Sequence, residues 1–117
     1  MKTENKIQEL SFDFSIQIIS LYKTLVEKKE YVLSKQLLRS GTSIGANIEE
    51  AIAAQTRKDF ITKMSIASKE ARETRYWLRL LDKSNLVDVD YSAYLNSIEQ
   101  IINILPKIVK TSQESMV

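Results

Sequence analysis

The chain has 117 residues, a formal net charge of +2 and 44% hydrophobic residues, with two glycines and one proline. This composition is too apolar for a disordered chain and too poor in turn formers for an all-β fold. It contains no cysteine and no histidine, which excludes disulfides, thiolate or imidazole metal sites and Ser-His or Cys-His nucleophile pairs. We expect one all-α domain over residues 1–117, with no metal and no cofactor.

The amino-terminal segment MKTENKIQELSFDFS is polar and lacks the apolar run and cleavage site of a signal peptide. No window approaches the roughly 18 unbroken apolar residues that mark a membrane span. The sequence therefore predicts a cytoplasmic protein that has no contact with a membrane.

The first predicted helix covers about residues 4–28 and is apolar on two sides. At about 100° per residue, one side is a core face. Its members are Ile7, Leu10, Phe14, Ile18, Leu21, Tyr22 and Leu25. A second apolar face consists of Phe12, Ile16, Ile19 and Val26. A small bundle does not need both faces for its core, so the second face predicts a contact between subunits; a wide core face within a monomer is the alternative.

Both glycines lie in the stretch SGTSIGAN, from Ser40 to Asn47, within a segment of helical period over residues 31–55. A phosphate-binding loop would need a Gly-Lys-Ser/Thr ending or a Gly-x-Gly-x-x-Gly pattern, and neither is present. Glycine inside a helix costs about 1 kcal/mol relative to alanine, so we interpret the small residues as a close helix crossing. They are Ser40, Gly41, Gly45 and Ala46. The alternative is a break near Gly41, which would give five helices.

The third predicted helix covers residues 57–82 and begins with Thr56 and Asp59 in a spacing like that of a capping box. Its core stripe consists of Phe60, Met64, Ala67, Ala71, Thr74, Leu78 and Leu81. Ile66, Trp77 and Leu80 form a second apolar strip beside this stripe, and we predict that this strip also belongs to a subunit interface.

A last helix follows Asp90, which is expected to cap it. Its apolar face consists of Tyr91, Tyr94, Leu95, Ile98, Ile101, Ile102, Leu105, Ile108 and Val109. Pro106 lies inside this helix and predicts a kink or a locally adjusted turn, after which the helical period continues. Four helices of similar length joined by short connections predict an up-down-up-down four-helix bundle.

The positive charge of the chain is concentrated in the third helix, because residues 57–83 carry eight basic and four acidic groups. One band on that helix holds Lys58, Lys69, Arg72, Arg79 and Lys83, with Arg57 and Arg75 at its edge. Such a band attracts phosphate backbones through counterion release, without reading sequence. The alternative is a solvated face whose arginines pair with nearby acids. Tyr76 lies within the band and either stacks on a base or covers a helix seam.

Catalysis is not expected. Di-iron sites in helix bundles need Glu-x-x-His pairs, and the chain has no histidine. Ser65 and Lys69 are four residues apart, but a Ser-Lys nucleophile needs a desolvated lysine, and Lys69 is predicted on a solvated face.

Two runs, QLLRSGTSIGANIEEA at residues 36–51 and FITKMSIASKEARETRYWLRLL at residues 60–81, resemble the bacterial four-helix-bundle proteins encoded by intervening sequences in 23S rRNA genes. The most specific parts are Ser43 to Glu50 and Glu73 to Leu78. The resemblance covers nearly the whole chain, with departures at Gly45 and Pro106. It implies a ring-shaped homo-oligomer, a pentamer, with no catalytic activity. It also implies a relationship to the accessory protein of diversity-generating retroelements, whose similar basic pentamer engages nucleic acid and a reverse transcriptase.

These observations predict a non-enzymatic, homo-oligomeric scaffold that binds RNA or DNA through Lys58, Lys69, Arg72, Arg75, Arg79 and Lys83, alongside a protein partner. The competing interpretation is a protein-binding assembly module whose basic face meets an acidic partner and has no role with nucleic acid.

Overall fold

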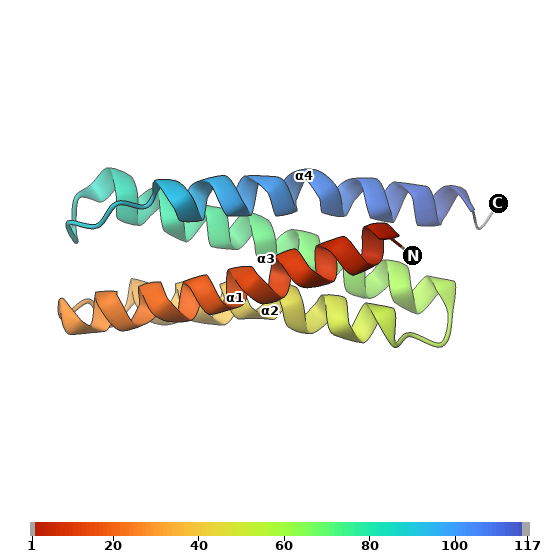
Figure 1. Ribbon diagram of the computed structural model, residues 1–117, viewed down its shortest axis with the longest axis horizontal. Coiled ribbons are helices and arrows are strands. Elements are labelled where there is room, and N and C mark those ends of the chain that lie inside the picture. The colour runs from red at the N-terminus through yellow and green to blue at the C-terminus, as the bar shows by residue number, and fades with distance from the viewer. Residues whose placement is uncertain (1, 116–117) are drawn as a thin grey trace.

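Four helices run alternately up and down the long axis of the molecule in the computed structural model, which describes residues 2–115 (Figure 1). They are α1 (Lys2–Glu27), α2 (Leu33–Ile52), α3 (Arg57–Ser84) and α4 (Ser92–Glu114). Each helix packs against the next in the chain, and α1 also packs against α4. The order along the chain is therefore the order around the bundle, which confirms the predicted up-down-up-down four-helix architecture.

The core consists of the apolar stripes that the helical period predicted. Buried side chains come from all four helices, and Ile18, Ile44, Met64 and Ile98 are fully inaccessible to solvent. Leu10 is only half-buried at the rim of this core. Ile52 follows Ile48 by four residues but is exposed, because α2 ends at this residue and the chain turns away.

The helix α2 is continuous through both glycines. These residues therefore form neither a phosphate-binding loop nor a helix break near Gly41. Gly41 lies against α1. A Cβ atom built at this position would be 2.9 Å from the Cγ2 atom of Ile18. Gly45 also faces α1, but a Cβ atom there would be 3.4 Å from the Oγ atom of Ser15, which is an ordinary contact distance. Of the two glycines, only Gly41 therefore lacks room for a Cβ atom beside α1.

Two other members of the predicted crossing have different surroundings. Ala46 is exposed, so its assignment to the close crossing is wrong. It lies on the side of α2 that faces away from the core. Ser40 is fully buried but faces α3, where its Oγ atom lies 2.9 Å from the hydroxyl oxygen of Thr74. A small polar residue at this position joins α2 to α3 through a buried hydrogen bond.

The start of α2 is held by Glu30, a residue that the sequence did not single out. One of its carboxylate oxygens accepts hydrogen bonds from the backbone N–H groups of Val32 and Leu33, at 3.1 and 2.9 Å. The other oxygen accepts from the N–H of Ser34 at 2.6 Å. These donors have no partner within the helix, and a negative charge is favourable at a helix amino terminus. Glu30 thus replaces the usual short capping side chain.

The remaining helix ends follow the sequence more closely. The Thr56 side chain accepts a hydrogen bond from the backbone N–H of Asp59, as the capping spacing predicted. Asn85 ends α3 in the left-handed conformation, with φ of 54°. Asp90 was expected to cap α4, but the cap position is Tyr91, whose side chain makes no capping hydrogen bond. Asp90 instead accepts hydrogen bonds from the N–H and the hydroxyl of Ser92, and these bonds lower the pKa of its carboxyl group. The helix α4 then continues through Pro106 to Glu114.

Candidate nucleic-acid interface

Five cations line the outer surface of α3 and point away from the core. We call this set the basic face; its members are Lys58, Lys69, Arg72, Arg79 and Lys83. All five side chains are exposed, and none forms an ion pair with the side chains described between residues 4 and 115. At about 1.5 Å per residue, the basic face is about 37 Å long. The pairing with nearby acids that would have neutralised this face is absent for these five residues.

Arg75 has a different position. It is half-buried at the seam between α3 and α4, where its guanidinium group lies 2.9 Å from the Glu99 carboxylate. Its charge is therefore already compensated, and we no longer count it among the cations open to a ligand. Lys63, on the opposite seam, pairs with Glu50 of α2 at 2.8 Å. That hydrogen bond and the charge of Glu50 raise the pKa of Lys63.

A shallow groove of about 230 Å³ extends the basic face onto α4. Its walls contain Ser65, Ser68, Lys69 and Arg72 from α3, and Pro106, Val109, Lys110 and Gln113 from α4. Three of these side chains are cations and none is a carboxylate. Lys110 was not among the predicted binding residues, because the period of one helix does not say which neighbouring helix its polar side meets.

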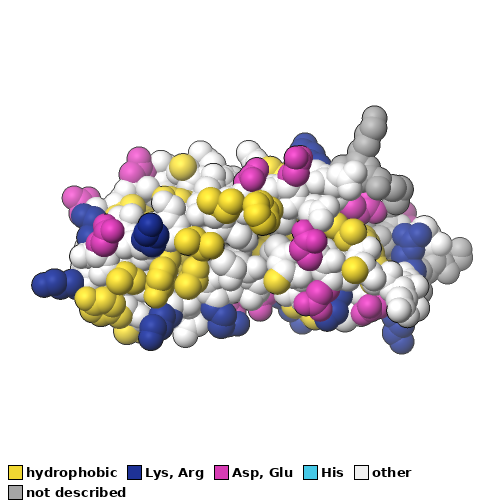
Figure 2. Space-filling model, turned by 60° about the horizontal axis from the view of Figure 1, so that its bottom comes forward, with side chains coloured by type: hydrophobic (Ala, Val, Ile, Leu, Met, Phe, Trp, Pro, Cys, Tyr) yellow, Lys and Arg dark blue, Asp and Glu magenta, His cyan; other side chains and the backbone are white. Residues whose placement is uncertain are grey.

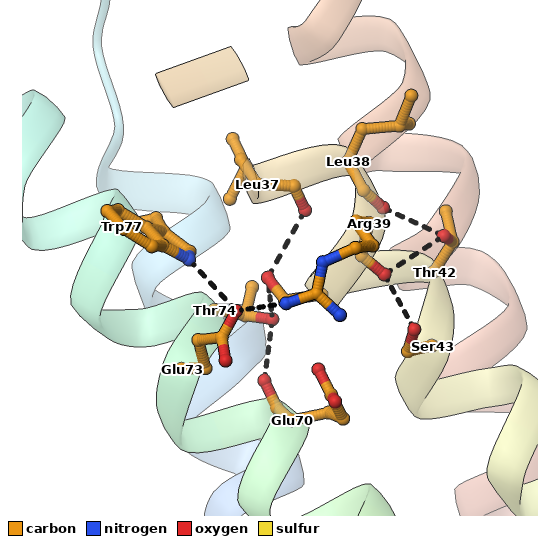
Figure 3. Close-up of polar contacts among 10 residues, drawn as sticks. Leu37, Leu38, Arg39, Thr42, Ser43, Glu70, Glu73, Thr74 and Trp77 are labelled. Carbon is orange, nitrogen blue, oxygen red and sulfur yellow. Dashed lines mark hydrogen bonds and ion pairs between the residues drawn. The ribbon is translucent and has the colours of Figure 1, made fainter. Parts of the chain in front are cut away.

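A polar seam between α2 and α3 lies beside the basic face (Figure 3). One carboxylate oxygen of Glu73 lies 2.8 Å from the guanidinium group of Arg39, on α2. The same oxygen accepts a hydrogen bond from the indole N–H of Trp77 at 3.2 Å. Glu73 therefore links Trp77 of α3 to Arg39 of α2. The two most family-specific segments of the sequence, Ser43 to Glu50 and Glu73 to Leu78, lie on the two helices that this seam joins.

The carboxylates of α2 and α3 do not converge on one site. Glu49 accepts a hydrogen bond from the side-chain amide of Gln8 on α1, and Glu50 forms an ion pair with Lys63 on α3. The two carboxylates therefore lie on different sides of α2. One oxygen of Glu70 is buried at the α2/α3 seam and has no hydrogen-bond partner in the described part of the chain. Within that part there is also no group of three side chains arranged to hold a metal ion.

An exposed apolar strip lies on α1. Phe12, Ile16 and Ile19 are 63%, 54% and 45% exposed. In Figure 2, hydrophobic side chains gather over the half of this surface that is nearer the connection of α1 to α2. Tyr31 and Val32, in that connection, are also exposed. The sequence predicted the first three as interface residues, and the fold leaves them uncovered within one chain.

The remaining predicted interface residues are more enclosed. Val26, Trp77 and Leu80 are half-buried, and Ile66 lies at the margin with 37% exposure. The predicted interface residues of α1 are therefore more exposed than those of α3. Trp77 lies on the side of α3 that faces α2, because its hydrogen-bond partner Glu73 binds Arg39 of α2.

A second hollow, of about 490 Å³, lies at the end of the bundle. It is formed where the start of α1 and the start of α3 meet the end of α4. Its lining mixes Glu4 with Lys6, Arg57 and Lys107 around Ile104 and Ile108. Three cations and one carboxylate thus surround an apolar floor, and none of these residues belongs to the basic face.

The fold and surface define a class of helical bundle protein with one uncompensated basic face and one exposed apolar strip. Over the residues described, no helix is both long and apolar enough to cross a membrane. Residues 3–107 match the family of 23S rRNA-intervening sequence proteins. The chain belongs to this family, as the resemblance of its second and third helices had indicated.

A solved structure is similar to this chain in both sequence and fold. It is the crystal structure of a protein of unknown function from the S23 ribosomal protein family of Bacteroides thetaiotaomicron. The two sequences are 49% identical, the match covers 92% of this chain and 98% of the other, and the TM-score is 0.88. No curated protein matches the chain. The relationship to the accessory protein of diversity-generating retroelements stays a prediction.

Proposed function

We propose that this protein is a non-enzymatic, homo-oligomeric scaffold that binds RNA or DNA through the basic face of α3. The observation that carries the proposal is the set of five exposed cations without ion-pair partners in the described chain. A row of cations that were already paired with carboxylates would attract a phosphate backbone only weakly. An uncompensated row attracts it, because each contact releases condensed counterions from the nucleic acid.

The shape of the surface supports binding without sequence readout. The basic face follows one side of α3 and is therefore nearly straight. The groove beside it adds the charge of Lys110 and the polar groups of Ser65, Ser68 and Gln113. The groove is shallow and does not enclose a base edge. Contacts of this kind position a backbone but carry no sequence information.

The homo-oligomer, expected to be a pentamer from the family resemblance, is supported by the apolar strip on α1. Exposed apolar patches of this kind usually mark interfaces. In a ring, each subunit would add one more basic face, and several faces bound to one nucleic acid give an avidity that a single chain lacks.

Replacing Phe12 and Ile16 with serine is expected to lower the mass of the assembly while the helical content stays unchanged. The fold of one chain does not need these side chains, because more than half of each is exposed. Sedimentation velocity of the parent and the double variant at the same protein concentration measures the mass, and circular dichroism checks the fold. A monomeric parent, or a variant with the mass of the parent, would contradict the oligomer.

Competition distinguishes the proposal from an assembly module that binds an acidic protein. Labelled single-stranded RNA is bound to the protein, and its fluorescence anisotropy is followed as unlabelled heterogeneous RNA or polyglutamate is added at equal charge concentration. We expect RNA to displace the label at a much lower concentration than polyglutamate. Equal displacement, or no binding of RNA at low salt, would favour the acidic-protein interpretation.

A further inference from the structure

A single aromatic side chain interrupts the basic face of α3. Tyr76 follows Arg72 by four residues and precedes Arg79 by three, which places all three on one side of the helix. Lys69 and Lys83 continue the same row in both directions. The Tyr76 side chain is 56% exposed, and its hydroxyl forms no hydrogen bond within the described chain. Packing against the core does not account for a ring in this position.

The ring of Tyr76 is nevertheless held in place along one side. It contacts Trp77 edge to face, with ring centroids 5.2 Å apart and an angle of 68° between the planes. Trp77 donates its indole N–H to Glu73, which in turn binds Arg39 of α2 (Figure 3). The orientation of Tyr76 is thus supported by a chain of contacts that reaches the neighbouring helix, while more than half of its side chain stays open to solvent.

We propose that Tyr76 is a stacking platform for a base of single-stranded nucleic acid whose phosphates lie on the flanking cations of the basic face. The inference rests on the proposed function and adds the class of nucleic acid. Arg72 and Arg79 lie about 6 Å and 4.5 Å along the helix axis on either side of Tyr76, so a strand following α3 meets a cation before and after the stacked base.

An aromatic ring within a positive surface favours single strands for a physical reason. Every base has a flat π face, so stacking on a tyrosine tolerates any sequence. In a duplex the bases are already stacked on their neighbours, and a ring on the outside of the duplex reaches only the backbone. A basic face alone would not make this distinction, because it binds the phosphates of both forms.

The test compares Tyr76→Ala with Tyr76→Phe, which keeps the aromatic ring and removes only the hydroxyl. Anisotropy is measured with a labelled single-stranded RNA and with a duplex of the same sequence. Tyr76→Ala is expected to weaken single-strand binding roughly 5- to 150-fold. Tyr76→Phe is expected to stay within about twofold of the parent, and duplex binding is expected to change little in both variants.

Salt dependence adds a readout that loss of fold would not reproduce. Stacking releases no counterions, so the plot of log affinity against log salt for Tyr76→Ala should run parallel to that of the parent. Removing Arg72 should instead flatten the slope by about 0.7.

Unchanged single-strand affinity in Tyr76→Ala would overturn the inference while the proposed function stands. A change in the mass of the assembly in that variant would also overturn it, because the ring would then belong to a subunit interface. If the parent binds neither form of nucleic acid, the proposed function itself is wrong.

Discussion

Replacing Gly41 with leucine is expected to lower the free energy of unfolding by about 3 kcal/mol, at the upper end of the usual cost of overpacking a core. Even the first added carbon would lie 2.9 Å from Cγ2 of Ile18, whose side chain is fully buried in the core. The helix α1 must shift to admit the side chain. The higher helix propensity of leucine offsets only about 1 kcal/mol of this cost.

The matched control is Gly45→Ala, on the same helix and also facing α1. An alanine Cβ there lies at ordinary contact distance from Ser15 and from the backbone of Ser11. The variant should therefore gain helix propensity and be more stable by up to about 1 kcal/mol. Urea denaturation at a fixed protein concentration measures both variants, since assembly makes stability depend on concentration. If Gly41→Leu unfolds at the same urea concentration as the parent, the close approach does not stabilise the fold.

Replacing Lys69, Arg72 and Arg79 together with alanine is expected to weaken binding of single-stranded RNA by on the order of 100-fold at about 50 mM salt. These three cations lie in the middle of the basic face and have no ion-pair partner in the described chain. Their loss removes about three phosphate contacts and the counterions that those contacts release. Fluorescence anisotropy measures the affinity.

The charge-matched control replaces Lys23, Lys28 and Lys35 with alanine. These three lysines are also exposed, but they lie on α1, on α2 and in the connection between them. The control changes the net charge of the chain by the same amount, so a comparable loss of affinity would mean that net charge, and not the basic face, attracts RNA. We expect the control to bind within a few-fold of the parent.

Helical periodicity was sufficient to predict the four helices and most of the core. The stripe containing Ile7, Phe14 and Ile18 is buried as predicted, because a face of this width has to be covered in a bundle of this size. The capping by Glu30 was not predictable in the same way. Glutamate is not a usual cap residue, and its role depends on a turn that brings its carboxylate back to three N–H groups of α2.

The candidate site was predictable only at the level of one helix. The period of α3 placed Arg72 and Arg75 on neighbouring positions, but it did not show that Arg75 meets Glu99 on another helix and Arg72 meets no acid. The same limit explains Lys110, whose contribution depends on how α4 packs against α3. Ala46 was assigned by residue size, and size does not determine which side of a helix faces a neighbour.

The most direct measurement of the central claim is the salt dependence of RNA binding by the parent and by the variant lacking Lys69, Arg72 and Arg79. For single-stranded RNA, each phosphate contact contributes about 0.7 to the slope of log affinity against log salt. We predict a steep line for the parent and a slope smaller by about 2 for the variant, both with the same oligomeric mass. Binding that does not depend on salt, or equal slopes for the two proteins, would contradict the basic face of α3 as the nucleic-acid interface.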